Sequence, residues 1–137
     1  MHFEISVDID AAPETVWNLL TDVEHWPDMT DSIDQVELLD KPFAVSSRAR
    51  VRQPKIPAAI WTVTDLKENE SFTWESRSAG VTTTATHAMT PGENGVTVRL
   101  TLGQKGPLAP VIGLLTGRLT RRYVTMEADG LKAKAEQ

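Results

Sequence analysis

One early segment, residues 12–27, constrains the fold of this chain more than any other. Its sequence, APETVWNLLTDVEHWP, predicts two short helices in tandem. Pro13 and Glu14 suit a first helical turn, because a missing N–H costs nothing there and a carboxylate meets the positive end of the helix dipole. The apolar residues that follow at helical spacing, and so form one stripe, are Val16, Leu19, Leu20 and Val23.

The second helix of the pair has its own start and stop signals. Thr21 followed three residues later by Glu24 fits a capping box, and Pro27 is expected to end the helix. A helix pair this early in a chain otherwise rich in strand patterns leaves few candidate folds.

Length and composition indicate a single globular domain, residues 1–137. The chain is 40% hydrophobic and 24% charged, which is ordinary for a soluble protein with one core. No apolar run approaches the ~20 residues of a membrane span, and the start of the chain is no secretory signal, so we expect a cytoplasmic protein. The chain contains no cysteine, which excludes disulfides, thiolate catalysis and cysteine-ligated metals.

Charge is divided unequally along the chain. Residues 1–40 contain eleven acidic and no basic residues, whereas residues 41–137 contain fourteen basic and eight acidic ones. We expect the two parts to attract one another within one fold. The net charge of −5 argues against a nucleic-acid-binding module, and the period-2 row Arg48, Arg50 and Arg52 is expected on a solvated strand face.

A second basic cluster lies near the end of the chain. Arg118, Arg121 and Arg122 are neighbours on one face of the predicted last helix. They could pair with the acidic N-terminal part, bind an anionic headgroup of a ligand, or simply be solvated.

The pattern between the first and last helices is that of an antiparallel meander. Residues 3–9 alternate apolar and polar side chains and predict a strand before the helix pair. Six further strands are expected, separated by short turns, at 33–39, 48–53, 59–66, 71–77, 81–90 and 96–103. From about residue 107 to 135 the period becomes helical, with proline and glycine weakening the first half. The predicted architecture is an α+β fold of order β-α-α-β6-α.

Several short pieces, in this order and spacing, carry a family resemblance. They are residues 13–17, 20–27, 50–54, 61–63, 72–74 and 130–132. The chain resembles the Bet v 1-like, START-related superfamily (SRPBCC), in its polyketide cyclase/dehydrase branch. The resemblance implies a helix-grip fold, in which a curved antiparallel sheet wraps around a long C-terminal helix and encloses a cavity for a hydrophobic or amphipathic small molecule. Some members cyclise or dehydrate polyketides and some carry lipids; no catalytic motif is common to all of them, so none is carried over.

Strand parity supplies candidate cavity residues independently of the resemblance. Alternate residues of the predicted strands put two indoles, an imidazole, a thioether and small hydroxyls on shared faces, which suits a planar apolar ligand. With additions from the helices, the candidate ligand-binding residues are Trp26, Gln53, Trp61, Trp74, Thr83, His87, Met89 and Ile112. Trp61 and Trp74 could equally be core filler. Trp26 could cover the opening of the cavity or anchor the short helix.

His87 is the one candidate for catalysis. A neutral imidazole on an apolar strand face could hydrogen-bond a ligand carbonyl or phenol, or move a proton, and Asp65 could orient the ring. The alternative is a core histidine satisfied by a neighbouring group. The three histidines, His2, His25 and His87, lack metal-ligand spacing, and no glycine-rich phosphate loop occurs, so neither a metal nor a cofactor is expected.

Three classes of function remain open. The first is a carrier or sequestering protein that binds a hydrophobic or aromatic small molecule between the sheet and the last helix. The second is a polyketide cyclase or dehydratase that uses the same cavity. The third is an interaction module, which a cavity filled by side chains and an exposed apolar patch nearby would favour. The expected partner is a small molecule, and the oligomeric state is open, with a homodimer among the possibilities.

Overall fold

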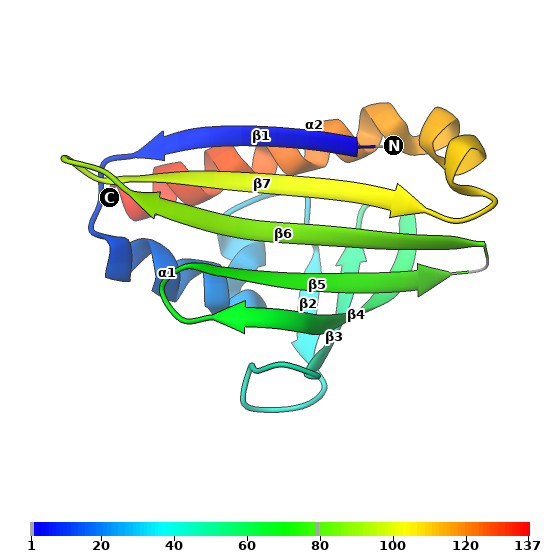
Figure 1. The fold of residues 1–137 in the computed structure, drawn as a ribbon, viewed down its shortest axis with the longest axis horizontal. Helices are drawn as coiled ribbons and strands as arrows, with labels where there is room; N and C mark the ends of the chain where they lie inside the picture. Colours follow the sequence, from blue (N-terminus) through cyan, green and yellow to red (C-terminus); the bar gives the residue numbers. More distant parts are fainter. Residues whose placement is uncertain (1, 79) are drawn as a thin grey trace.

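The structure is a computed structural model that describes residues 2–78 and 80–137 (Figure 1). Its elements follow the predicted order. They are β1 His2–Ile9, α1 Pro13–Thr21, the 3-10 helix η1 Val23–Asp28, β2 Gln35–Leu38, β3 Arg48–Gln53, β4 Ile56–Lys67, β5 Ser71–Ser78, β6 Val81–Pro91, β7 Val96–Lys105 and α2 Ala109–Ala135.

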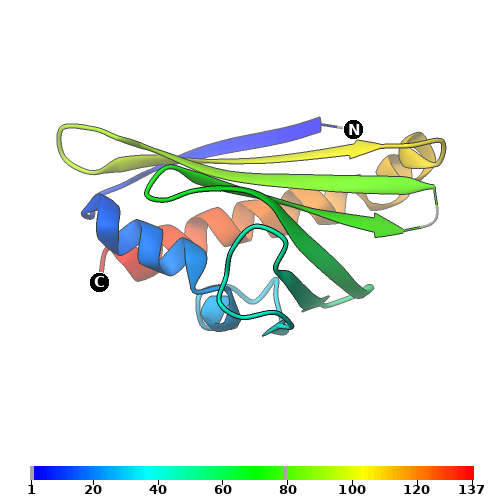
Figure 2. The same cartoon turned by 60° about the horizontal axis from the view of Figure 1, so that its bottom comes forward.

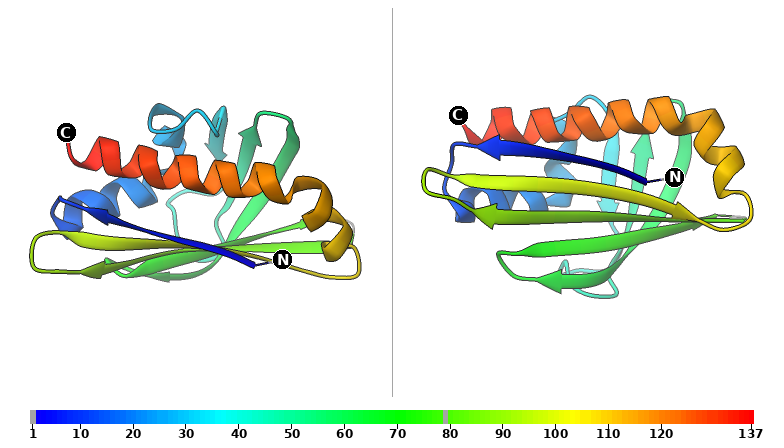
Figure 3. Two further views of the ribbon diagram at one scale, coloured as in Figure 1. Left: turned by 90° about the horizontal axis from the view of Figure 1, so that it is seen from above. Right: turned by 45° about the horizontal axis from the view of Figure 1, so that its top comes forward.

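The strands form one antiparallel sheet in the order β1-β7-β6-β5-β4-β3-β2. Consecutive strands from β2 to β7 are neighbours, and β1 pairs with β7, so α1 and η1 carry the chain from one edge of the sheet to the other. The sheet curls, and β2 to β4 rise beside the helix layer (Figures 2 and 3). The predicted α+β helix-grip fold is confirmed.

Helix α2 runs along the inner face of the sheet and forms the second layer (Figure 3). It contacts β1, β6 and β7 on the sheet and α1 beside it. At about 1.5 Å per residue its 27 residues measure roughly 40 Å along the helix, whose first turns lie at an angle to the rest (Figure 3). Within the described residues, no helix combines the length and apolar character that a membrane span requires.

The capping box predicted for the second helix is wrong. The hydroxyl of Thr21 donates to the carbonyl of Trp17 in α1, and Asp22 is the residue that precedes η1. The Glu24 carboxylate instead accepts the backbone N–H of Leu38, 3.0 Å away, and so ties η1 to β2. Glu24 therefore holds the edge of the sheet rather than the start of a helix.

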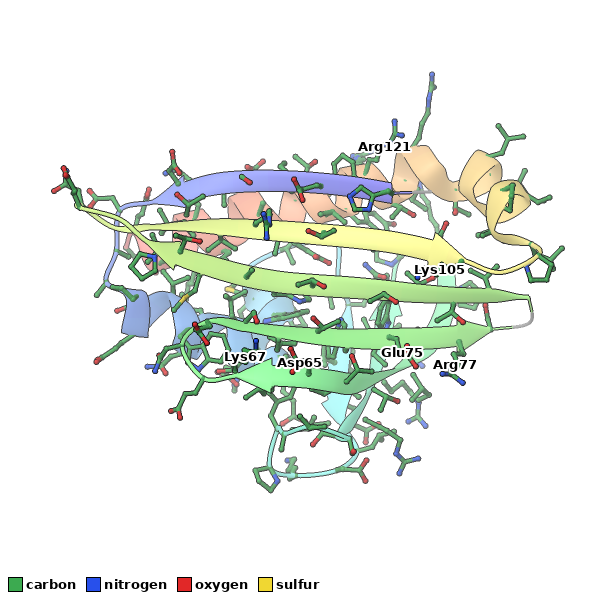
Figure 4. The ribbon with its side chains drawn as sticks, viewed as in Figure 1. Asp65, Lys67, Glu75, Arg77, Lys105 and Arg121 are labelled. Atoms are coloured by element: carbon green, nitrogen blue, oxygen red, sulfur yellow. The ribbon has the colours of Figure 1, made fainter. Side chains whose placement is uncertain are left out.

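A β-bulge in β4 changes the predicted parity of that strand. Val63 is opposite Trp74 on β5, but the register shifts before Asp65, which is opposite Thr73. As a result Val63 and Leu66 turn inward while Asp65 is exposed, beside Lys67 on the outer face (Figure 4). The expected contact between Asp65 and the His87 ring does not form.

The basic row on β3 lies on the outside of the sheet, as predicted. Arg48 pairs with Asp40 and Arg50 with Glu37, each at 2.9 Å between nitrogen and oxygen, and all four side chains are largely exposed. These pairs join a basic strand to acidic residues of the N-terminal part, but at such exposure each contributes only about 0–1 kcal/mol.

Candidate functional site: a cavity under the C-terminal helix

A small cavity, partly open to solvent, lies between the middle of the sheet and α2. Its volume is about 70 Å³. The sheet, the loop before β2 and one face of α2 line it with Trp26, Ile33, Val51, Gln53, Ile56, Trp61, Trp74, Ala85, His87, Leu102, Thr120, Tyr123, Val124 and Glu127. Most of these side chains are apolar or aromatic, so polar groups stand out in this lining.

Three tryptophans form an aromatic wall. The Trp74 ring lies 5.3 Å from that of Trp26 and 5.6 Å from that of Trp61, measured between centroids. Trp26 comes from η1 and is 5% exposed, and its indole N–H donates to the carbonyl of Leu19 in α1. Trp26 therefore anchors the short helix and lines the cavity at the same time.

His87 is the buried polar group of the sheet. Its ring stacks on Phe72 of the neighbouring strand, with centroids 4.2 Å apart and planes 10° from parallel. Burial lowers the pKa of His87 to about 4, against the opposing effect of a backbone group of Phe72, so the imidazole is neutral at neutral pH. Its Nδ1 atom is buried and has no hydrogen-bond partner within the described residues. A buried ring nitrogen without a partner in the protein is able to bind a polar ligand group that reaches it.

Glu127 is the acidic group of the cavity, and it comes from α2. Loss of water around its carboxyl raises the pKa to about 7. A second void of about 20 Å³ adjoins Leu20, Met29, Leu100 and Leu131, and Trp26, His87 and Glu127 line this void as well as the cavity. These three side chains therefore lie between the cavity and the smaller void.

Two polar side chains of the lining, Gln53 and Tyr123, form hydrogen bonds with the backbone of neighbouring segments. The Gln53 side-chain amide donates to the carbonyl of Ser32 at 3.2 Å, which fixes the loop before β2 against β3. The Tyr123 hydroxyl donates to the carbonyl of Pro54, which joins α2 to the β3–β4 turn. Both polar side chains line the cavity but already have partners in the fold.

The structure brings together five of the eight candidate ligand-binding residues: Trp26, Gln53, Trp61, Trp74 and His87. Thr83, Met89 and Ile112 do not line the cavity. Thr83 and Met89 share the inward face of β6 with His87, but they lie beyond the cavity on either side, and Met89 is part of the hydrophobic core. Ile112 lies near the start of α2, whereas the cavity meets that helix only from Thr120 onward.

Glu127 is not among the predicted site residues, although the sequence holds a signal for it. Tyr123 and Leu131 are apolar residues at helical spacing, and position 127 lies four residues from each, so it shares their face of the helix. A carboxylate in the middle of an apolar helical stripe is expected to be costly unless it has a role. Within the described residues, no three histidine or carboxylate side chains gather as a metal site would require.

The curved sheet closed over a long helix defines a helix-grip protein. The chain belongs to the polyketide cyclase / dehydrase and lipid transport family, whose family model matches residues 1–136. No curated protein matches it in sequence.

Solved structures agree on the fold at low sequence identity. The Zhui aromatase/cyclase from Streptomyces sp. R1128 is 17% identical with a TM-score of 0.81, and the match covers 99% of this chain and 93% of that one. A hypothetical protein from Helicobacter pylori is 14% identical with a TM-score of 0.80, over 98% and 86% of the two chains. A START superfamily protein from Mycobacterium smegmatis is 16% identical with a TM-score of 0.74, over 97% of each. At these identities the likeness concerns the fold alone.

Proposed function

We propose that the protein binds a planar, largely apolar small molecule bearing one polar group in the cavity under α2, and so carries or sequesters it. The observation that carries the proposal is the unpartnered Nδ1 of His87, a residue that lines a mainly apolar cavity walled by three tryptophans. Aromatic side chains offer flat surfaces for a flat ligand, and one buried polar group fixes its orientation.

The cavity as it stands is smaller than such a ligand. A cavity of about 150 Å³ is known to hold benzene, and this one is about 70 Å³. A ligand therefore needs wall side chains to move. Trp26 is the side chain best placed to do so, because it lines both hollows and a single 3.2 Å hydrogen bond to Leu19 holds its indole. Rotation of Trp26 would join the two hollows into one.

His87 and Glu127 define the chemistry of the polar end. At neutral pH the imidazole is uncharged, and Glu127, with a pKa of about 7, is protonated in roughly half of the molecules. A protonated carboxyl can donate a hydrogen bond, and a neutral imidazole can donate or accept one according to its tautomer. This pair suits a phenol, an enol or a carbonyl better than a charged group.

Calorimetric titration with 2-naphthol tests this proposal. We expect saturable binding, about tenfold tighter than that of naphthalene, because the hydroxyl satisfies a buried partner worth roughly 1–2 kcal/mol. Ala85→Leu fills the cavity from the middle of β6 and should abolish binding while the protein remains folded. Ala88→Leu, the same change on the opposite face of the same strand, is the matched control and should bind like the wild type.

The proposal fails if neither ligand binds or if Ala85→Leu binds 2-naphthol as well as Ala88→Leu does. Native mass spectrometry of gently purified protein adds an independent check, since a resident hydrophobic molecule should travel with the folded chain.

A polyketide cyclase-type enzyme is the second candidate, and one observation favours it. A neutral imidazole and a carboxyl with a pKa near 7 border the same cavity, which suits proton transfer at neutral pH. In an aldol closure, His87 would take a proton from a methylene between two carbonyls as the new carbon–carbon bond forms. Glu127 would give its proton to the carbonyl oxygen, which becomes a hydroxyl, and a proton passed from imidazolium to carboxylate would reset the pair.

Glu127→Gln separates the two functions. If the site is catalytic, this variant should keep ligand affinity within about threefold and lose at least ~100-fold in turnover of a poly-β-ketone substrate. Wild-type turnover should also fall above pH 7, where Glu127 ionises. Turnover that survives in both Glu127→Gln and His87→Ala would exclude this mechanism.

A further inference from the structure

The start of α2 carries an apolar surface that no element of the fold covers. We call Leu108, Val111, Leu114 and Leu115 the α2 tip. Their side chains are exposed by 46%, 53%, 87% and 74%, respectively. Single exposed leucines are common, but four large aliphatic side chains within eight residues form a patch that indicates a contact with another apolar phase.

Basic residues continue the same face of the helix. Val111, Leu115, Arg118 and Arg122 follow one another at three- and four-residue spacing, and Arg121 lies beside them. All three arginines are exposed, and Arg121 lies over the Phe3 ring at 5.8 Å. Figure 4 shows Lys105, at the end of β7, at the same end of the molecule.

No acidic side chain neutralises this region from within its own segment. Residues 96–126 contain no aspartate or glutamate, in a chain whose net charge is −5. Within residues 2–78 and 80–137, Arg118, Arg121, Arg122 and Lys105 form no ion pair. Of the three roles left open for these arginines, pairing with the acidic N-terminal part does not occur within the described residues, and their side chains are exposed.

From this we infer that the α2 tip docks on an anionic lipid surface, with the leucines inserted at the level of the headgroups and the basic side chains against lipid phosphates. Aliphatic residues next to Lys and Arg are the composition that binds such interfaces. The α2 tip lies at one end of the molecule, level with the end of β7 and the start of β6 (Figures 1 and 3). An exposed apolar end can enter a lipid interface, which deforms around it, whereas a protein partner must offer a matching apolar surface.

The widest hollow described on the surface is a poor receptor for the α2 tip of a second copy. A wide surface hollow of about 650 Å³ is lined by Asp8, Asp10, Asn94, Thr97 and neighbouring residues of the β1 and β7 ends. The carboxylates of Asp8 and Asp10 would attract the arginines. However, burying these carboxylates against the leucines would remove their water without replacing its hydrogen bonds, which is costly. An anionic lipid surface therefore suits both the apolar α2 tip and the basic residues beside it. This inference does not depend on what the cavity binds.

Co-sedimentation with vesicles tests the inference. We expect the full chain to bind vesicles of phosphatidylcholine with 30% phosphatidylglycerol, and to bind pure phosphatidylcholine at least about tenfold more weakly, since each basic residue near an anionic surface is worth about fivefold. The double change Leu114→Ser and Leu115→Ser should reduce binding to the anionic vesicles at least about tenfold. Arg118→Gln with Arg122→Gln should reduce it and flatten its salt dependence.

Matched controls lie elsewhere on the surface. Val45→Ser removes another exposed aliphatic side chain, and Arg52→Gln removes an exposed arginine of β3; both should bind vesicles like the wild type. Absence of wild-type binding to anionic vesicles, or equal binding by the leucine double variant, overturns the inference. So does wild-type self-association by ultracentrifugation that the leucine variant abolishes without any vesicle binding, because the tip would then be a contact between copies.

Discussion

Replacing Glu127 with glutamine is expected to stabilise the protein by about 3 kcal/mol at pH 8 and to leave its stability unchanged at pH 4. The carboxyl has a pKa of about 7 in the folded chain and about 4.5 when unfolded. Because the folded value is raised, the unfolded state releases this proton first as the pH rises, and the wild type loses stability between pH 4.5 and 7. Glutamine keeps the shape of the protonated acid and cannot ionise.

Urea unfolding at several pH values between 4 and 8 measures the effect. The His87 contribution has the opposite sign, because its folded pKa is lowered to about 4 and stability is lost as the pH falls from 6.5. It is present in both proteins and largely cancels in their difference. Glu136→Gln is a control of opposite sign. The backbone N–H of Asp10 and then Lys132 lower the pKa of Glu136, so removing this carboxylate should destabilise the protein at pH 8. A Glu127→Gln variant no more stable than the wild type at pH 8 would contradict the raised pKa of the half-buried Glu127 carboxyl.

Gly130→Ala is expected to destabilise the protein by about 2–3 kcal/mol, a fall in Tm of roughly 10 °C. In an ordinary helix this change would stabilise by about 1 kcal/mol, so the expected sign is reversed. The reason is a close crossing: a Cβ at Gly130 would overlap the backbone carbonyl oxygen of Met29, which cannot move like a side chain. This crossing sets how near α2 lies to η1, and hence to Trp26.

Thermal unfolding of Gly130→Ala beside Gly103→Ala measures this. A Cβ at Gly103 would meet nothing within 4 Å, so that variant should unfold at or above the wild-type temperature. Equal stability of the two variants would mean that α2 does not approach the loop after η1 so closely.

The fold could be predicted because its determinants are local. Period-2 alternation marked the strands, a helical stripe marked each α-helix, and the short turns allowed only an antiparallel meander. Element ends were less accurate. β4 begins at Ile56 rather than at the predicted residue 59. Its first residues pair with β3 alone, since pairing with β5 starts at Thr62, and the start of a strand tolerates the missing N–H of Pro57.

The site could be predicted only in part, because parity tells which face a residue shares and not where along that face a cavity opens. His87 and Trp74 lie where the hollow is, while Thr83 and Met89 lie on the same face beyond it. Asp65 was misplaced because a bulge leaves no clear trace in one sequence. Glu127 could not be predicted from the apolar pattern of the last helix, because that pattern identifies only the apolar residues of the buried face.

His87 and Glu127 are the histidine and the carboxylic acid of the cavity lining, and the pKa of each is shifted. Each has a pKa shifted by loss of water, which costs stability, and neither forms an ion pair within the described residues. Groups kept in this way are typical of functional sites. The α2 tip is a separate feature, since its residues lie outside the cavity lining.

The indole N–H resonances of the four tryptophans, followed by NMR during titration with 2-naphthol, test most directly whether the cavity is a ligand site. Trp26, Trp61 and Trp74 line the cavity, whereas Trp17 is buried outside it and serves as an internal control. Ring currents of the bound ligand should shift the three cavity resonances along one saturating curve and leave Trp17 almost unchanged. Shifts of Trp17 as large as the others, or no saturable shift at all, would contradict binding in this cavity.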